Sequence, residues 1–345
     1  LDVTFMAKPF DGVAGSGEHT HLGLAAKLKN GKMTSVFAPK DMRTDFLNPI
    51  GYGALMGLLK NYEVVNPFVS SSIDSLNRLK PGYEAPVCIV TSLGRSPMEP
   101  SRNRTVLVGL IRDMNNPLAT RFELRAPNPK SNTYLVLAAS QMAMIDGIKH
   151  ALEHEKTPAE LERSISKAYG DKDFYLDTDR EYRSEKEVFE DYTEEERVKL
   201  FGHVPATVWE NMQVFDRYPE KLGIFKEGDV MKQQVLDSYR EQVISQWKTE
   251  LHDRVIPQNM ALIRGCVKLH SEDDFSDFDV KNWIEIDKLR HELGKDTITE
   301  KSILTRAKDA LDDGNYSEAS EMQKLIQKKV ATLISLYTRY KKNIL

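Results

Sequence analysis

The sequence predicts an α+β fold whose mixed N-terminal part is followed by a long all-helical region. Residues 1–153 alternate short β-rich runs with Gly and Pro turns, whereas residues beyond 154 carry almost only helical patterns. The chain has 345 residues, of which 40% are hydrophobic and 29% charged, so it can bury a sizeable core in two domains or one large one.

The N-terminal elements follow from apolar spacing and turn residues. Residues 20–28 alternate like a strand that ends at the turn Asn30-Gly31. Helical spacing over residues 53–62 predicts a helix that is closed by Asn66-Pro67. Three further runs are typical of strands and a fourth predicts a long core helix: residues 87–90, 105–111, 121–125 and 132–151.

The C-terminal elements are all helices. Residues 229–251 form one amphipathic pattern, and Pro257 is expected to end that region. Gly314 lies between the last two predicted helices as a C-cap, so those helices should form an antiparallel hairpin. The three final helices are predicted at residues 280–293, 299–312 and 316–342.

The composition excludes several classes of protein. Lys and Arg number 48 and Asp and Glu 52, and the resulting net charge of −4 argues against a dedicated nucleic-acid binder. No apolar run approaches the roughly 18 to 20 residues that a membrane span needs. Two cysteines, Cys88 and Cys266, cannot build a disulfide framework or a zinc site, so we expect a reducing, cytoplasmic location.

A glycine-rich turn precedes two histidines in the run Gly15-Ser16-Gly17-Glu18-His19-Thr20-His21. Glycines let backbone amides approach a small ligand, and His19 and His21, two residues apart on a strand, would share one face. This arrangement suits a metal ligand beside a phosphate contact. The same spacing also fits a tight turn that feeds a strand with a solvated polar face.

A second run with a possible functional role carries a carboxylate next to a predicted turn. Glu84 follows the turn Pro81-Gly82, where it could act as a base or close over a site. An ordinary surface loop explains the same residues.

Charged side chains also alternate along a predicted strand. Arg121, Glu123 and Arg125 should share one face, while Phe122 and Leu124 face the other way. Together with the preceding run Ser101-Arg102-Asn103-Arg104, such a face can hold an anion and a cation, as phosphoryl transfer requires. A salt-bridged outer face of a half-buried sheet is the alternative.

Taken in order, seven elements over about 145 residues resemble glutamine synthetase, and the His-x-His turn is more similar to the type I enzymes. The resemblance implies a curved, largely antiparallel sheet backed by helices, with the metal site in its concavity. It divides the chain into the C-terminal half of the catalytic domain (1–153), family-like C-terminal helices (154–260) and an additional helical bundle (261–345). The elements are Phe5-Met6-Ala7-Lys8-Pro9, Gly15-Ser16-Gly17-x-His19-x-His21, Arg78-Leu79-x-Pro81-Gly82-Tyr83-Glu84-Ala85-Pro86, Asn103-Arg104, Arg121-x-Glu123-x-Arg125-x-Pro127-x-Pro129, Asn132-x-Tyr134-Leu135 and Met142-Ala143-x-x-Asp146-Gly147-Ile148-Lys149.

The resemblance also implies an activity: ATP activates glutamate to γ-glutamyl phosphate, and ammonia then displaces phosphate to give glutamine. Mg²⁺ or Mn²⁺ would assist, and the full-length protein would assemble as a ring-shaped homo-oligomer. On this resemblance, His19 and Glu123 would be metal ligands, and His21 and Arg121 would contact ATP. Gly15, Arg78 and Arg125 would bind glutamate. Arg104 would contact the transferring phosphoryl group, and Glu84 would cover the site and help to deprotonate ammonium.

The chain departs from the family's pattern at three positions. Ala14 stands where an Asn that helps to bind glutamate is usual, and Leu118 where a lysine is common. A family arginine falls on Gly109, and we expect Arg112 to lie close enough to replace it. The run Asp173-Phe174-Tyr175-Leu176 resembles a loop whose tyrosine is adenylylated in some bacteria.

Because the chain begins at Leu1 inside a strand-like run, we expect it to be a piece of a longer protein whose remaining metal ligands lie upstream, and to be inactive alone. Two other functions stay open. One is a γ-glutamyl ligase for another amine, which Ala14 keeps in view. The other is a catalytically dead scaffold or regulator, against which the retained site residues argue.

Overall fold

The computed structural model describes residues 3–9, 14–80, 85–202, 204–273 and 275–344. The chain separates into two compact units: unit 1 comprises Leu1–Pro205 and Asn211–Ser238, and unit 2 comprises Ala206–Glu210 and Tyr239–Leu345. Among the described residues, no helix has the length and apolar character that crossing a membrane requires.

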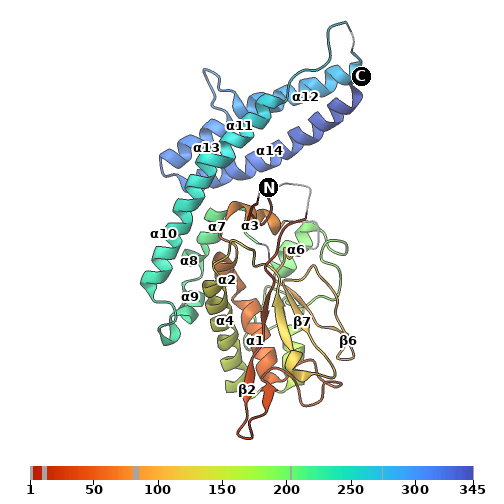
Figure 1. The fold of residues 1–345 in the computed structure, drawn as a ribbon, viewed down its shortest axis with the longest axis vertical. Coiled ribbons are helices and arrows are strands. Elements are labelled where there is room, and N and C mark those ends of the chain that lie inside the picture. The colour runs from red at the N-terminus through yellow and green to blue at the C-terminus, as the bar shows by residue number, and fades with distance from the viewer. Residues whose placement is uncertain (1–2, 10–13, 81–84, 203, 274, 345) are drawn as a thin grey trace. The chain divides into compact units, whose positions relative to one another are not determined.

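The sheet that carries the candidate site lies in unit 1 (Figure 1). Within the described residues its strand order is β1, β8, β7, β4. Strand β8 pairs antiparallel with β1 and β7, whereas β4 pairs parallel with β7. The predicted α+β class and largely antiparallel sheet are therefore confirmed. The strands are β1 (Thr20–Leu22), β4 (Thr91–Ser92), β7 (Val108–Ile111) and β8 (Arg121–Leu124).

Strand β8 has the two faces that its alternating sequence predicts. Phe122 is fully buried and stacks on Phe37 with ring centroids 5.0 Å apart, and Leu124 is fully buried beside it. Arg121 and Glu123 are only partly buried. Apolar burial of one face leaves the opposite face free to carry charged side chains.

Two long helices of unit 1 pack closely together (Figure 1). They are α1 (Pro49–Lys60), capped by the Asn48 side chain, and α4 (Thr133–Glu153), capped by the Asn132 side chain. Gly57 and Gly147 lie where the two backbones meet, and a Cβ at Gly57 would lie 2.8 Å from Gly147 N and 3.0 Å from Gly147 Cα. The lack of a side chain therefore lets these helices approach.

Two predicted boundaries in this unit are wrong. Asn66-Pro67 does not close a helix but lies inside α2 (Tyr62–Val69), because Asn66 is held by hydrogen bonds from the Tyr62 hydroxyl and to Asn211. Residues 87–90 are not a strand. The N–H groups of Val87 and Val90 bond to carbonyls two residues earlier, which curls the chain into the core before β4 begins.

The remaining elements of unit 1 are short. The predicted strand at residues 20–28 is divided into β1 and β2, and β2 pairs with β3 in a hairpin whose turn contains Gly31 at φ +82°. These elements are β2 (Ala25–Lys27), β3 (Met33–Ser35), α3 (Ile73–Arg78), β5 (Gly94–Ser96), β6 (Glu99–Pro100), a 3₁₀ turn (Pro117–Ala119), α5 (Pro158–Ile165), α6 (Glu194–Phe201), α8 (Val214–Arg217), α9 (Pro219–Lys226) and a second 3₁₀ turn (Glu227–Asp229).

Unit 2 is helical, as predicted. Its last two helices are joined through Gly314 at φ +72° and pack on each other, which confirms the hairpin. Pro257 does not end the helical region: the chain continues with helical backbone angles through a π-helical turn (Leu251–Val255), and Pro257 is the second residue of the next helix. The helices are α7 (Val208–Met212) and α10 (Gln233–Glu250), which both units share, and α11 (Ile256–Gly265), α12 (Asp277–Gly294), α13 (Ile303–Asp312) and α14 (Tyr316–Asn343).

Candidate active site

A histidine, a glutamate and an arginine meet at the end of β1 and β8. His19 Nδ1 lies 2.8 Å from Glu123 Oε1, and Arg125 Nη1 donates to the same oxygen at 2.9 Å. Antiparallel pairing of the two strands brings these residues together although more than 100 positions separate them. Burial, followed by the charge of Arg125, lowers the pKa of His19, while Glu123 opposes this change. The imidazole is therefore held in its neutral, metal-binding form.

Arg78 closes this cluster from helix α3. Its guanidinium donates to the carbonyls of Ala126 at 2.9 Å and Arg125 at 3.0 Å, and one nitrogen lies 3.3 Å from His19 Nε2. Burial, then the charge of Arg125, lowers the pKa of Arg78 to about 10. A Cβ at Gly15 would lie 2.8 Å from Arg78 Cγ, so the glycine turn and this arginine are packed against each other.

A cavity of about 610 Å³ opens beside these residues. Its lining includes His19 and Glu123 together with three arginines, Arg102, Arg104 and Arg125. The Nε of Arg125 is buried and has no hydrogen-bond partner among the described residues. A cavity wall in which arginines outnumber carboxylates is suited to an anionic group such as a phosphate or carboxylate.

His21 and Arg121, the predicted ATP contacts, lie together but outside the lining of this cavity. Arg121 Nε donates to His21 Nδ1 at 2.9 Å, and its Nη1 donates to the Ala119 carbonyl at 2.8 Å. Both side chains stand on the same paired strands as Glu123, which faces His21 in the register. They therefore form a neighbouring polar surface.

Two expected residues need separate mention. Glu84 lies outside the described residues, and its role stays a prediction. Arg112 does not replace the arginine that is absent at Gly109, because its guanidinium donates to the carbonyls of Pro97, Met42 and Asp45 at 2.7 to 2.8 Å. Gly109 itself lines the cavity.

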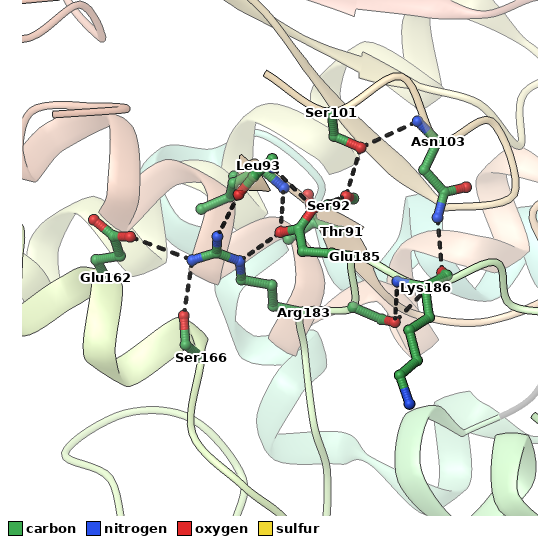
Figure 2. Close-up of polar contacts among 12 residues, drawn as sticks. Thr91, Ser92, Leu93, Ser101, Asn103, Glu162, Ser166, Arg183, Glu185 and Lys186 are labelled. Atoms are coloured by element: carbon green, nitrogen blue, oxygen red, sulfur yellow. Dashed lines mark hydrogen bonds and ion pairs between the residues drawn. The ribbon is translucent and has the colours of Figure 1, made fainter. Parts of the chain in front are cut away.

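Sequence reasoning missed Ser92 in the cavity wall and the acidic residue behind it. Ser92 is buried, and its hydroxyl contacts both Ser101 and Glu185, which lies 93 residues further along the chain (Figure 2). Only a contact across the fold connects these residues, and no local pattern marks them. The neighbouring Asn103 belongs to a run that the sequence singles out, and it does line the cavity.

Tyr175, in the run that resembles an adenylylated loop, is buried. Its side chain is 5% exposed, and its hydroxyl lies 2.5 Å from Asp146 Oδ2 and accepts from Asn61 Nδ2 at 3.2 Å. In this conformation the hydroxyl is a structural hydrogen-bonding group that a modifying enzyme cannot reach.

The donor pair His19 and Glu123 fits a divalent metal. Two neighbouring ligand atoms of octahedral Mg²⁺, each about 2.1 Å from the ion, lie about 3 Å apart, close to the 2.8 Å between Nδ1 and Oε1. Among the described residues, no group of three or more His, Cys, Asp or Glu side chains is arranged to hold an ion. These two residues would therefore be part of a ligand set that other oxygens complete.

Comparison with known proteins relates the N-terminal part of this chain to one family. Residues 1–169 match the family described as "Glutamine synthetase, catalytic domain". Glutamine synthetases of Clostridium saccharobutylicum and Sulfolobus acidocaldarius are 38% and 39% identical over 165 and 153 residues, which cover 48% and 44% of this chain and 33% and 29% of theirs. Glutamine synthetase of Salmonella typhimurium is 32% identical over 221 residues, covering 58% of this chain and 44% of its own.

Residues 1–169, just under half of this chain, are thus similar to part of a glutamine synthetase catalytic domain. The chain spans about a third of the length of several curated relatives that it matches, including the first. A cryo-EM structure of Plasmodium falciparum glutamine synthetase is similar with a TM-score of 0.48 and 20% identity, covering 70% of this chain and 46% of that one.

Proposed function

We propose that this chain forms part of an ATP-dependent ligase that joins ammonia to glutamate through γ-glutamyl phosphate. The observation that carries the proposal is the cavity whose lining brings the His19–Glu123 pair together with Arg102, Arg104 and Arg125. Transfer of a phosphoryl group needs such cationic side chains, because negative charge accumulates on the transferring oxygens.

The proposal gives each of the candidate residues a role. Arg104 would stabilise the transferring phosphoryl group from the cavity wall. Arg78 and Arg125 would bind the carboxylates of glutamate, beside the backbone of Gly15. His21 and Arg121 would contact ATP from the adjoining polar surface, and Glu84 would cover the site and help to take a proton from ammonium.

Mg²⁺ or Mn²⁺ would be held by His19 and Glu123 with ligands supplied by other oxygens. The bound ion supplies Lewis-acid chemistry that neutralises charge on the nucleotide phosphates. Arg125 holds Glu123 Oε1 through its Nη1, so the arginine also orients the carboxylate. A cover over the cavity would exclude water, which would otherwise hydrolyse an acyl phosphate.

The proposal extends to the whole protein. Its partners are glutamate and ammonia, its assembly is a ring-shaped homo-oligomer, and its location is the cytoplasm, where the free thiols of Cys88 and Cys266 stay reduced. In this proposal residues 1–153 are the C-terminal half of the catalytic domain, residues 154–260 are family-like helices and residues 261–345 are an added bundle. Ala14 favours one second candidate, a ligase for glutamate and another amine, because a side chain usual for glutamate binding is absent there.

Phosphate release by the full-length protein tests these functions. ATP, Mg²⁺ and glutamate are supplied with ammonia and then with a panel of amines. Glu123→Gln should reduce turnover by at least about 100-fold, while Glu99→Gln, an exposed carboxylate in β6, serves as the matched control and should be unaffected.

Each outcome of this assay is informative. Turnover with ammonia supports glutamine synthesis, and turnover with another amine alone supports the second candidate. A protein that releases no phosphate with any amine would contradict both and would favour a scaffold or regulator. Mn²⁺ binding by this chain, measured by electron paramagnetic resonance, should weaken in Glu123→Gln but not in Glu99→Gln.

A further inference from the structure

A chain segment beyond the matched residues 1–169 extends the sheet that carries the site. Residue Arg183 forms a parallel bridge with Thr91 of β4. The Thr91 N–H donates to the Tyr182 carbonyl at 2.9 Å, and the Ser184 N–H donates to the Thr91 carbonyl at 2.9 Å. Residues 182–184 therefore pair with β4 on the side opposite β7, and residues 182–188 are here called the edge segment.

Glu185 of the edge segment is an acceptor for four donors (Figure 2). Its Oε1 accepts from Leu93 N at 3.1 Å and from Arg183 Nε at 2.7 Å. Its Oε2 accepts from Gly94 N at 2.9 Å and from the Ser92 hydroxyl. Burial alone would raise the pKa of Glu185, but the hydrogen bonds from Ser92 and Arg183 outweigh it and lower the pKa. The Glu185 carboxylate is therefore ionised, and each of its two oxygens accepts two hydrogen bonds.

Arg183 anchors this carboxylate to the rest of unit 1. Its guanidinium donates to the Gly94 carbonyl at 2.8 Å and to Ser166 Oγ at 3.0 Å, and it contacts Glu162 Oε1 at 3.3 Å. A guanidinium with several fixed acceptors has little freedom to rotate, so Glu185 is held in one place.

Hydrogen bonds continue from Glu185 into the cavity wall. Ser92 Oγ lies 2.6 Å from Ser101 Oγ, which accepts from Asn103 N at 3.1 Å. An ionised carboxylate only accepts, so the single Ser92 hydroxyl proton is directed to Glu185 and the Ser92 oxygen can accept from Ser101. The amide of Asn103 also donates to the carbonyl of Lys186 at 2.9 Å. The edge segment therefore holds the loop of residues 101–104 at two points.

We infer that Glu185 is a positioning residue of the active site: through Ser92 and Ser101 it fixes the loop that presents Arg104 to the phosphoryl group. Ser92, Ser101, Asn103 and Arg104 all line the same cavity as Glu123. Glu185 touches no reacting atom in this scheme and acts only through the loop. The inference rests on the proposed function, because the phosphoryl group is the ligand that the loop would meet.

Glu185→Gln is the direct test, because it keeps the shape of the side chain but offers one acceptor oxygen in place of two. Its NH₂ group would oppose two of the four donors. Glu190→Gln, an exposed carboxylate a few residues further along the chain, is the matched control. Steady-state phosphate release by the full-length protein is measured with ATP, Mg²⁺, glutamate and the amine that supports turnover.

Glu185→Gln should lower kcat about 10- to 100-fold, as displacement of a catalytic group by a supporting side chain typically does. The KM for glutamate should change less than about threefold, because Arg78 and Arg125 do not depend on this loop. Ser92→Ala removes the next link and should lower kcat in the same way. The double variant should be no worse than the poorer single variant, since both changes break one chain of bonds.

Hydrogen exchange of residues 93–105 gives a readout that needs no turnover. The amide of Asn103 should exchange at least about tenfold faster in Glu185→Gln than in Glu190→Gln. If the unmodified protein turns over no amine, the proposed function fails and this exchange measurement alone decides the inference.

An active protein in which Glu185→Gln equals Glu190→Gln in kcat and in exchange would overturn the positioning role and leave the function intact. A raised glutamate KM with unchanged kcat would overturn it as well. If Glu185→Gln does not fold, Ser92→Ala decides: normal kcat and normal Asn103 exchange in that variant would refute the inference.

Discussion

Replacement of Gly57 by alanine should destabilise unit 1 although alanine is the better helix former. In an isolated helix this substitution gains about 1 kcal/mol. In α1, however, the new Cβ would lie 2.8 Å from Gly147 N and 3.0 Å from Gly147 Cα, whereas ordinary contacts begin at 3.4 Å. The carbonyl oxygen of Ala143 would lie closer still, so the two helices must separate by more than about 0.6 Å, the difference between 2.8 and 3.4 Å.

The cost of this separation follows from the packing of α1. Nine consecutive residues of the helix, from Gly51 to Leu59, are buried. A radial gap of about 0.5–1 Å forfeits a quarter to a half of each dispersion contact, and overpacking typically costs about 1–3 kcal/mol. Because the obstacle is backbone rather than a flexible side chain, we expect about 3 kcal/mol, or about 2 kcal/mol net of the helix gain.

A glycine in another helix provides the matched control. Gly223 lies in α9, and no atom lies within 4 Å of the place that a Cβ would take there, so Gly223→Ala should stabilise the protein by up to about 1 kcal/mol. Urea unfolding followed by far-ultraviolet circular dichroism measures both variants. The three tryptophans, Trp209, Trp247 and Trp283, lie in unit 2, so their fluorescence reports that unit separately. Equal stability of Gly57→Ala and Gly223→Ala would refute the packing argument.

Three further properties can be measured on the same chain. Burial alone would raise the pKa of Asp74, but hydrogen bonds from the backbone and from Lys130 lower it below 3.8. The contribution of the ionised carboxylate to stability is therefore complete above pH 3.8 and is lost as the pH falls through the lowered pKa. Asp74→Asn should remove this dependence of stability on pH from acid unfolding curves. Tyr175→Phe removes a hydrogen bond to a carboxylate and should lower the free energy of unfolding by about 1.5–3 kcal/mol in urea titrations. Burial raises the pKa of the Cys88 thiol to about 12, so a thiol-specific chromophore should label Cys88 only after unfolding, and rapid labelling of the native protein would contradict its burial.

The sequence predicts those parts of the site that lie on regular elements. The alternation of Arg121, Phe122, Glu123 and Leu124 has the period of a strand, and burial of the two apolar members fixes which face carries the charges. The contact between His19 and Glu123 is different. The spacing of His19 and His21 fits either a metal site or a solvated strand face. Only the family resemblance predicts from the sequence that His19 and Glu123 act together, and the structure places them in contact.

The predicted ends of helices and strands are wrong where tertiary contacts override the local conformational preference. Pro67 should end a helix, yet α2 continues through it because Asn66 is fixed by partners in the same helix and across the fold. The short distance along the chain from Gly109 predicts Arg112 at the cavity. In the structure three backbone carbonyls accept hydrogen bonds from the Arg112 guanidinium and orient this side chain elsewhere. No local sequence pattern predicts such contacts with backbone carbonyls.

The edge segment shows why the site does not end where the family match ends. Thr91 and Leu93 are fully buried and Ser92 is 2% exposed, so their polar groups need partners within the protein. Those partners are Tyr182, Ser184 and Glu185, all beyond residue 169. A buried polar group without a partner costs about 1–3 kcal/mol, and several would be left if the edge segment moved away. The cavity wall that includes Arg104 is therefore built by residues on both sides of residue 169, where the family match ends. Substitutions in the edge segment should alter the site, although all of its sequence motifs lie within the matched residues.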